Sequence, residues 1–261
     1  MKKLVVANWK MNPQTEAEAL ALVSSWEHNL KQEQKHCDVV VCPPAIFLPA
    51  VSKHLKAVKL GAQNMSWTDN GSLTGEISDI QLKEFGVEYV ILGHSERRLN
   101  LGETDSVVNA KLVEALKHHI TPILCLGGEE GAIENEMKTL VTKQFVQCTK
   151  GLSEHDLAKV VYVYEPIWAI STMKNSRPAT GEHARDLIEH VYMLLEHRMP
   201  AKAARAVKVL YGGTVNKDNV HEYAKYPEIC GALVGAASLD EKNFWAVITE
   251  FSRESVHHLN T

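Results

Sequence analysis

The sequence predicts a single-domain (β/α)8 barrel, in which eight parallel strands alternate with helices and close into a ring. Two observations carry this prediction. Short apolar segments rich in Val, Ile and Leu recur eight times along the 261 residues, and amphipathic stretches separate them. No glycine- or serine-rich linker, low-complexity tract or block of like charge divides the chain. Eight strand–helix repeats over roughly 250 residues match the size of such a barrel, so we expect residues 1–261 to form one domain.

The expected strands are mostly apolar on both faces, with little alternation, which is typical of parallel strands covered by helices on the outside and by one another inside. In chain order they are LVVAN (4–8), DVVVC (38–42), VKLGAQ (58–63), YVILG (89–93), TPILCLG (121–127), VVYVYE (160–165), VKVLYGG (207–213) and GALVG (231–235).

The stretches between the strands favour helices. Residues 15–32 place apolar side chains at helical spacing, as an amphipathic helix requires. The segment 45–56 is the weakest helix prediction because Pro49 interrupts it. An open, doubly wound sheet is the alternative, but no GxGxxG motif follows the first strand. The remaining expected helices are 79–85, 104–119, 132–148, 184–199, 216–225 and 240–253.

Composition argues against several classes of function. The 28 basic and 32 acidic residues give a net charge of −4. This balance does not indicate the excess of positive charge that binding to nucleic acid or to an anionic membrane requires. Five widely spaced cysteines without a CxxC pair favour a reduced, cytoplasmic protein. No apolar run is long enough for a signal peptide or a membrane span. The histidine pairs at 118–119 and 257–258 lack partners at metal-ligand spacing, so we expect no metal there.

Unusual polar residues gather where the predicted strands end. In a (β/α)8 barrel these ends meet at one mouth, which carries the catalytic groups. Taken singly, each residue also has a structural interpretation: a lone histidine is more often a hydrogen-bonding residue than a catalyst, and a Gly-Gly pair is usually a turn. The residues are Asn8 and Lys10 after the first strand, Gln63 and Asn64 after the third, His94, Ser95 and Glu96 after the fourth, Glu165 after the sixth, Gly212, Gly213 and Thr214 after the seventh, and Gly235 and Ala236 after the eighth.

Glu165 is the most unusual of these residues. It ends the apolar run VVYVY, and the apolar segment IWAI follows it after Pro166. A carboxylate in such surroundings costs free energy unless it is paired or used. We therefore interpret Glu165 as a general base.

Two turns with small residues fit a phosphate group. Gly212–Gly213 and Gly235–Ala236 follow the seventh and eighth strands, where barrel enzymes bind phosphate through backbone N–H groups. Lys10 offers a counter-charge. The ligand is expected to be a small phosphorylated molecule.

Many motifs in one order resemble the triosephosphate isomerase family, whose members are TIM barrels. The resemblance implies interconversion of glyceraldehyde 3-phosphate and dihydroxyacetone phosphate through an enediolate, in glycolysis and gluconeogenesis, with no metal or organic cofactor. The motifs that carry it run from the first strand to the last helix: NWKMN (8–12), GAQNMS (61–66), TGEIS (74–78), VILGHSERR (90–98), GETD (102–105), YEPIWAI (164–170), YGGTV (211–215) and LVGAASL (233–239).

The resemblance also implies roles for particular residues. Glu165 matches the catalytic base, and His94 matches a neutral imidazole that polarises the carbonyl and shuttles protons. Asn8 and Lys10 match groups that hold the substrate oxygen and stabilise negative charge, and Glu96 matches a carboxylate that orients the lysine region. Backbone N–H groups for the phosphate are implied at Ser171, Thr214, Gly235 and Ala236.

The segment 64–78 resembles the projecting third loop of the family. In that family the loop inserts into a neighbouring subunit, which implies a homodimer in which Thr74 touches the partner's Asn8–Lys10 region. From composition alone, a loop of this length is unusual in a compact barrel and is often functional.

The chain departs from the family pattern at its lid. Ser171 and Met173 replace two glycines, and about three extra residues follow Lys174. Because glycine alone reaches positive φ without penalty, we expect these side chains to bias the lid toward its open state if closure needs such a conformation. Gly128 replaces a glutamate that would pair with Arg98, while Thr214 and Ala236 replace Ser and Gly and keep their N–H groups.

When only the residues are considered, two alternative functions stay open. A Schiff-base aldolase would need a lysine in an apolar setting on a barrel strand, but the only lysine at a strand end is Lys10. A phospho-ligand sensor without turnover is supported only by the substitutions in the lid.

Overall fold

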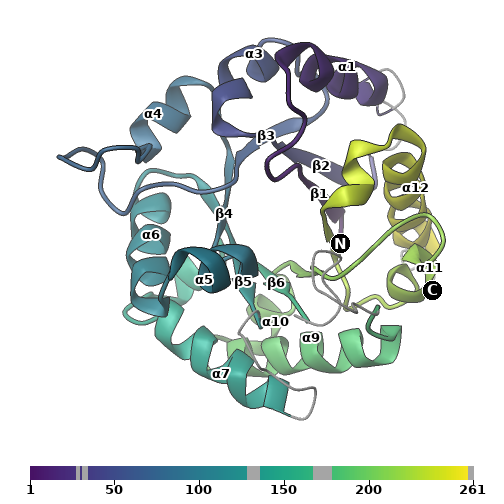
Figure 1. Ribbon diagram of the computed structural model, residues 1–261. Helices are drawn as coiled ribbons and strands as arrows, with labels where there is room; N and C mark the ends of the chain where they lie inside the picture. The colour runs from purple at the N-terminus through teal and green to yellow at the C-terminus, as the bar shows by residue number, and fades with distance from the viewer. Residues whose placement is uncertain (28–29, 31–34, 128–135, 167–177, 258–261) are drawn as a thin grey trace.

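The structure, a computed structural model, describes residues 1–27, 30, 35–127, 136–166 and 178–257. Its eight strands form one closed barrel in chain order, and every neighbouring pair is parallel. Helices surround the strands (Figure 1). The predicted (β/α)8 barrel is therefore confirmed.

All eight predicted strands are present, and their ends differ from the predicted ones by at most two residues. Glu165 lies just beyond the sixth strand, at the mouth, and not within it. The strands are β1 (Lys3–Asn8), β2 (Cys37–Cys42), β3 (Lys59–Ala62), β4 (Tyr89–Leu92), β5 (Thr121–Leu126), β6 (Val161–Tyr164), β7 (Val209–Tyr211) and β8 (Gly231–Val234).

Gly231 allows the barrel to close. The residue pairs with Leu4 where β8 meets β1, and its φ of +146° is one that side chains with a Cβ rarely adopt. A Cβ at this position would lie 1.7 Å from the carbonyl oxygen of Leu4. Glycine is therefore required for the last strand to approach the first.

Each predicted helix has a counterpart among the described residues, but α11 is shorter than the predicted 216–225, and residues 28–29, 31–32 and 132–135 of two predicted helices lie outside the described residues. Several further helices were not predicted. Helix α5 was missed because SERRLNL has too few apolar residues to show a helical period. Pro49 lies in the first turn of α3, which a proline tolerates, so it does not interrupt a helix. The elements are α1 (Glu16–Glu27), η1 (Ala45–Phe47), α3 (Leu48–Ser52), α4 (Asp79–Glu84), α5 (Ser95–Leu101), α6 (Asp105–Lys117), α7 (Met137–Cys148), α8 (Glu154–Leu157), α9 (Gly181–Glu196), α10 (Ala201–Ala204), α11 (Val220–Ala224), η4 (Ala236–Leu239) and α12 (Glu241–His257).

The helix starts near the mouth are fixed by side-chain caps. Ser78 accepts a hydrogen bond from the Gln81 N–H while the Gln81 side chain bonds back to the Ser78 N–H, a capping box that begins α4. Thr104 caps α6, because its hydroxyl accepts a hydrogen bond from the Val107 N–H. These caps set the positions at which the loops after β3 and β4 return to the barrel wall.

The apolar core has two layers. Side chains such as Val6, Ile91 and Leu210 fill the barrel interior, and a larger cluster packs between the strands and the surrounding helices. Strands buried on both faces explain why the sequence shows continuous apolar runs. Within the part of the chain that is described, no helix combines the length and apolar character needed to cross a membrane.

We expect the cysteine thiols to be unreactive in the folded protein. None of the five forms a disulfide bond, and all are buried. Burial raises the pKa of the Cys148 thiol to about 12, and burial, followed by the charge of Glu165, raises the pKa of Cys125 well above its usual value. Because the thiolate is the reactive form, none of the five thiols should react with a disulfide reagent at pH 8 until the protein unfolds. Titration of thiols with and without guanidinium measures this; rapid reaction of a native thiol would contradict it.

Candidate active site

The carboxyl ends of β1, β4 and β6 bring the predicted acid–base residues together. Asn8 is the last residue of β1, His94 lies two residues beyond β4, and Glu165 directly follows β6. Residues far apart in the chain thus meet because parallel barrel strands all end at one face. The polar residues that the sequence analysis singled out at strand ends therefore lie together at the barrel mouth.

Glu165 is almost fully buried, with 1% of its surface exposed. Its Oε2 accepts a hydrogen bond from the Ser95 N–H at 2.9 Å, and its Oε1 lies 3.1 Å from His94 Nε2. A Cβ at Gly212 would lie 2.9 Å from Cγ of Glu165, so the glycine after β7 makes room for the acid. Ser95 holds the carboxylate through its backbone, a contact that sequence reasoning did not assign.

The hydrogen bonds of His94 indicate a neutral imidazole. His94 is the N-cap of α5, and its Nδ1 accepts a hydrogen bond from the Glu96 N–H at 3.2 Å. Only an unprotonated Nδ1 can accept this bond. The ring proton therefore resides on Nε2, which faces Glu165 and the mouth.

Lys10 is held by three groups around it. Its Nζ lies 2.6 Å from Glu96 Oε1, and its backbone N–H donates to Asn8 Oδ1 at 3.2 Å. Gln63 Nε2 donates to the carbonyl oxygens of Lys10 at 2.8 Å and Cys42 at 2.9 Å. These contacts stabilise a left-handed backbone at Lys10, with φ of 55°, which costs free energy in a residue with a Cβ.

A cavity of about 350 Å³ opens over these residues. Asn8, Lys10 and His94 line one side, and the glycine turns after β7 and β8 line the other, including Thr214 and Gly235. Ala236 also lines it and begins η4. The structure thus brings all the predicted phosphate-binding residues that it describes to the same cavity. Ser171, Met173 and the lid lie outside the described residues.

A second cavity of about 260 Å³ shares Asn8, Lys10 and His94 and extends beneath the loop after β3. Asn64, which lines this cavity, accepts a hydrogen bond from the buried Lys111 Nζ at 2.8 Å, and the same Nζ donates to Glu103 Oε1 at 2.5 Å. Sequence reasoning missed this pair. The signal was present, because Lys111 lies between Val108, Leu112 and Ala115 on the apolar face of α6.

Arg98 has a partner other than the one that the family pattern suggests. Its guanidinium donates to Asp105 Oδ1 at 2.6 Å and to the Gly93 carbonyl oxygen at 2.7 Å. Gly128, which replaces the expected glutamate, lies outside the described residues. Asp105 therefore supplies a carboxylate for Arg98 from the start of α6.

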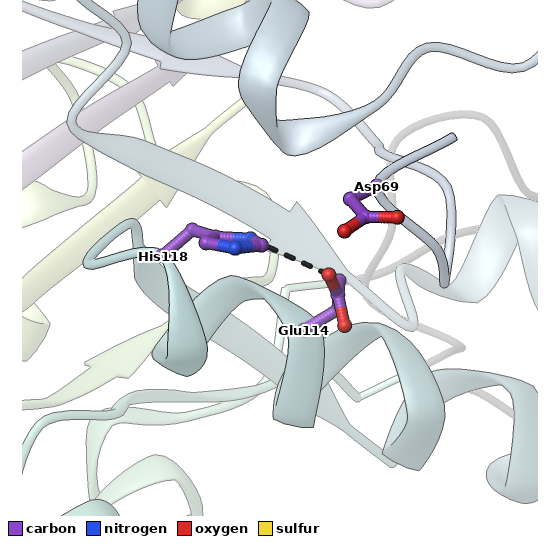
Figure 2. Close-up of side chains that lie close together, drawn as sticks. All are labelled: Asp69, Glu114 and His118. Carbon is purple, nitrogen blue, oxygen red and sulfur yellow. Dashed lines mark ion pairs between the residues drawn. The ribbon is translucent and has the colours of Figure 1, made fainter.

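The expectation that no metal binds at the histidine pair 118–119 stays a prediction, although the fold brings two carboxylates close to His118. One ligand atom each from Asp69, Glu114 and His118 lie within 4.8 Å of one another (Figure 2). Glu114 lies one helical turn before His118, a spacing visible in the sequence. Asp69 comes from the loop after β3, and its approach could not be deduced without the fold. Residues 258–261 lie outside the described residues.

A closed (β/α)8 barrel with a buried carboxylate against a neutral imidazole, next to a lysine and two small-residue turns, defines an acid–base enzyme for a small anionic substrate. Lys10 pairs with Glu96 and does not lie in an apolar pocket, which disfavours a Schiff-base mechanism.

Comparison with known proteins narrows this class to one family. The family model for triosephosphate isomerase matches residues 3–251. The chain is 41% identical to the triosephosphate isomerase of Caldanaerobacter subterraneus subsp. tengcongensis over 251 residues, which cover 95% of this chain and 98% of that protein. It is similarly 38% identical to that of Dictyoglomus thermophilum and 40% identical to that of Clostridium novyi, with the same shares covered. The chain belongs to the triosephosphate isomerase family.

Proposed function

We propose that Glu165 and His94 move the protons in the reaction of this family. The chain is an isomerase, and it interconverts glyceraldehyde 3-phosphate and dihydroxyacetone phosphate in glycolysis. Glu165 removes a proton from the carbon beside the carbonyl group, which gives an enediolate, and returns it to the neighbouring carbon. The observation that carries this assignment is the buried Glu165 carboxylate within 3.1 Å of His94 Nε2.

His94 is the electrophile in this proposal. Its Nε2–H donates to the substrate oxygens in turn, and it moves a proton between them as the enediolate forms and collapses. The bond from the Glu96 N–H to Nδ1 keeps the ring in the required tautomer. To reach a substrate carbon, Glu165 must give up its contact with Nε2, so substrate binding separates the two side chains.

Lys10 and Asn8 position the substrate and offset its charge. The Lys10 ammonium borders the same cavity as the turns after β7 and β8, where it meets both the phosphate-bearing ligand and the developing oxyanion. Glu96 orients the ammonium through their 2.6 Å contact. Backbone N–H groups at Thr214, Gly235 and Ala236, together with Ser171 of the lid, bind the phosphate.

A coupled assay tests the function. Conversion of glyceraldehyde 3-phosphate to dihydroxyacetone phosphate, measured with glycerol-phosphate dehydrogenase and NADH, should proceed unchanged in EDTA because protein side chains carry out each proton transfer. Binding of a phosphoglycolate-like analogue without turnover would instead support a sensor. Covalent trapping of a lysine by borohydride in the presence of substrate would support a Schiff-base enzyme.

We also propose that the protein is a single-domain, cytoplasmic homodimer. The loop before α4 projects from the barrel (Figure 1), and Thr74 in it is exposed. Met11 and Ile46, in the segments after β1 and β2, expose 86% and 77% of their surfaces, and Leu101 at the end of α5 exposes 66%. Exposed apolar side chains of this size support an interface, and the second cavity beside Lys10 offers space for the partner's loop. The five buried cysteines, none of which forms a disulfide, support a reducing compartment.

Shortening the loop tip should give a monomer of low activity. Deletion within 65–76 removes the proposed contact between Thr74 and the partner's mouth, so Lys10 loses support from across the interface. Light scattering at micromolar concentration measures the mass, and the coupled assay measures kcat. A Lys83→Ala variant, on the neighbouring exposed helix surface, is the control. If the intact protein has the monomer mass of 29.1 kDa, the dimer proposal is wrong.

A further inference from the structure

The segment between β7 and α11 carries one of the two small-residue turns that face the mouth cavity. Residues 212–219 belong to no strand or helix, so their backbone polar groups need partners outside regular structure. The segment begins with Gly212 and Gly213, and glycine has more conformational freedom than any other residue. Other contacts must therefore fix the direction of the N–H groups in this turn.

Different partners tie down the two ends of the turn. On the β6 side, the Gly212 N–H donates a hydrogen bond to the Tyr164 carbonyl oxygen at 2.8 Å. On the α11 side, Asn219 Nδ2 donates to the Thr214 carbonyl oxygen at 2.9 Å. The turn 212–214 is thus held between the last residue of β6 and a side chain at the start of α11.

Asn219 makes a second bond that closes the segment on itself. Its Oδ1 accepts a hydrogen bond from the Asn216 N–H at 2.8 Å, so one planar amide binds two backbone groups as donor and acceptor. The Val220 N–H donates to the Asn216 carbonyl oxygen at 3.0 Å, and the Val220 side chain is buried. The position of Asn219 is therefore set by the start of α11, which is anchored in the core.

Two further asparagines hold the part of the segment that lies beyond the turn. Asn216 Oδ1 accepts from the Asp218 N–H at 2.9 Å, and Asn243 Oδ1, from α12, accepts from the Lys217 N–H at 3.4 Å. Asn216, Lys217 and Asn243 line the cavity of about 350 Å³, whereas Asn219 is not among the described residues that line it. Asn219 therefore acts on a ligand in this cavity through the backbone that it holds.

We propose that Asn219 is a positioning residue for the phosphate group of the substrate. This inference rests on the proposed role of the Thr214 N–H in phosphate binding. Because each peptide unit is planar, holding the Thr214 carbonyl oxygen fixes the backbone rotation at Thr214, while the bond to Tyr164 fixes the turn at Gly212. The N–H groups between these two points are directed before the ligand arrives, which lowers the conformational entropy that binding costs.

Loss of the Asn219 side chain should weaken phosphate binding and leave the proton transfers intact. Glu165 is held by the Ser95 N–H and faces His94, and neither contact involves Asn219. A substrate without a phosphate group should therefore react with the variant as it does with the wild type.

Steady-state kinetics of Asn219→Ala with two substrates tests the proposal. The value of kcat/KM for glyceraldehyde 3-phosphate should fall about five- to fiftyfold, as the loss of two hydrogen bonds implies. The inhibition constant of inorganic phosphate should rise by a similar factor. The value of kcat/KM for glyceraldehyde, which lacks the phosphate group and whose isomerisation is followed by proton NMR, should change by less than about twofold.

Two further variants separate positioning from stability. In Asn219→Asp, a carboxylate of nearly the same shape still accepts from Asn216 but offers no proton to the Thr214 carbonyl oxygen, so phosphate affinity should fall at least about fivefold. Asn109→Ala is the matched control, because Asn109 Nδ2 also donates to two backbone carbonyl oxygens, those of Cys148 at 2.7 Å and Lys150 at 3.0 Å. These residues line neither mouth cavity, so the control should keep wild-type kinetics with both substrates.

Unchanged phosphate affinity in both Asn219 variants, with a wild type that converts glyceraldehyde 3-phosphate, overturns the positioning role and leaves the proposed function intact. An equal loss of kcat/KM with both substrates in Asn219→Ala also overturns it, because Asn219 would then support the mouth as a whole. A wild-type protein that does not convert glyceraldehyde 3-phosphate contradicts the proposed function itself, and the role of Asn219 with it.

Discussion

Glu165→Gln should lower kcat by about 10²–10⁴-fold, the range typical of losing a general base. The amide has nearly the same shape and can still accept the hydrogen bond that Ser95 N–H donates to Oε2 at 2.9 Å, but it cannot take a proton from carbon. Substrate binding should change little because the side chain contributes no charge to phosphate recognition. Steady-state kinetics with the coupled assay, in both directions, measures the effect.

The Glu165→Gln result needs two controls. Circular dichroism and binding of a phosphoglycolate-like analogue establish that the fold and the cavity remain. Glu182→Gln, an exposed carboxylate in the first turn of α9, provides the same chemical change away from the mouth and should have near-normal kcat. A Glu165→Gln enzyme with near-normal kcat would mean that another group is the base.

Lys10→Met should lower kcat/KM by at least about 10²-fold, through both a higher KM and a lower kcat. Methionine matches the apolar part of the lysine side chain but lacks its terminal ammonium, so it removes the charge that Glu96 holds at 2.6 Å and keeps most of the packing. The ammonium meets the dianionic substrate in the ground state and the developing oxyanion in the transition state, so both parameters should change. Steady-state kinetics measures kcat and KM, and binding of a phosphoglycolate-like analogue measures the loss of ground-state affinity.

Lys217→Met is the matched control for Lys10. Lys217 borders the same cavity, but its Nζ pairs with Asp218 at the exposed rim, so its removal should have a small effect that falls further at high salt. The loss of kcat/KM in Glu96→Gln should lie between those in Lys10→Met and Lys217→Met, because the change weakens the positioning of the Lys10 ammonium without removing its charge. Unchanged KM and kcat in Lys10→Met would mean that Lys10 is a surface lysine without a role in binding or catalysis.

Much of the fold could be predicted because its physical causes are local. A strand covered on both faces must be continuously apolar, and this pattern marked all eight strands. The placement of Asn8, His94 and Glu165 at one mouth followed from the same eight strands, since parallel strands in a closed barrel share one direction. Glu165 was recognisable because a carboxylate after VVYVY has no simple structural reason.

Other parts depend on contacts between distant segments. Gln63 braces the Lys10 loop through two carbonyl oxygens, and Ser95 holds Glu165 through a backbone N–H; neither contact leaves a pattern in the sequence. The Asp79–His118 contact joins residues whose distance in the chain conceals it. Helix α5 begins because His94 caps it, although SERRLNL has no amphipathic period.

Isomerisation in deuterated water tests most directly whether a side-chain base moves the proton through an enediolate. A proton held on Glu165 exchanges with solvent before it returns to carbon, so dihydroxyacetone phosphate made from glyceraldehyde 3-phosphate should carry deuterium at C1 in a substantial share of molecules. Proton NMR of the product measures this share. Rapid turnover by the wild-type enzyme that yields product with no solvent deuterium at C1 would indicate a hydride shift and contradict the roles assigned to Glu165 and His94.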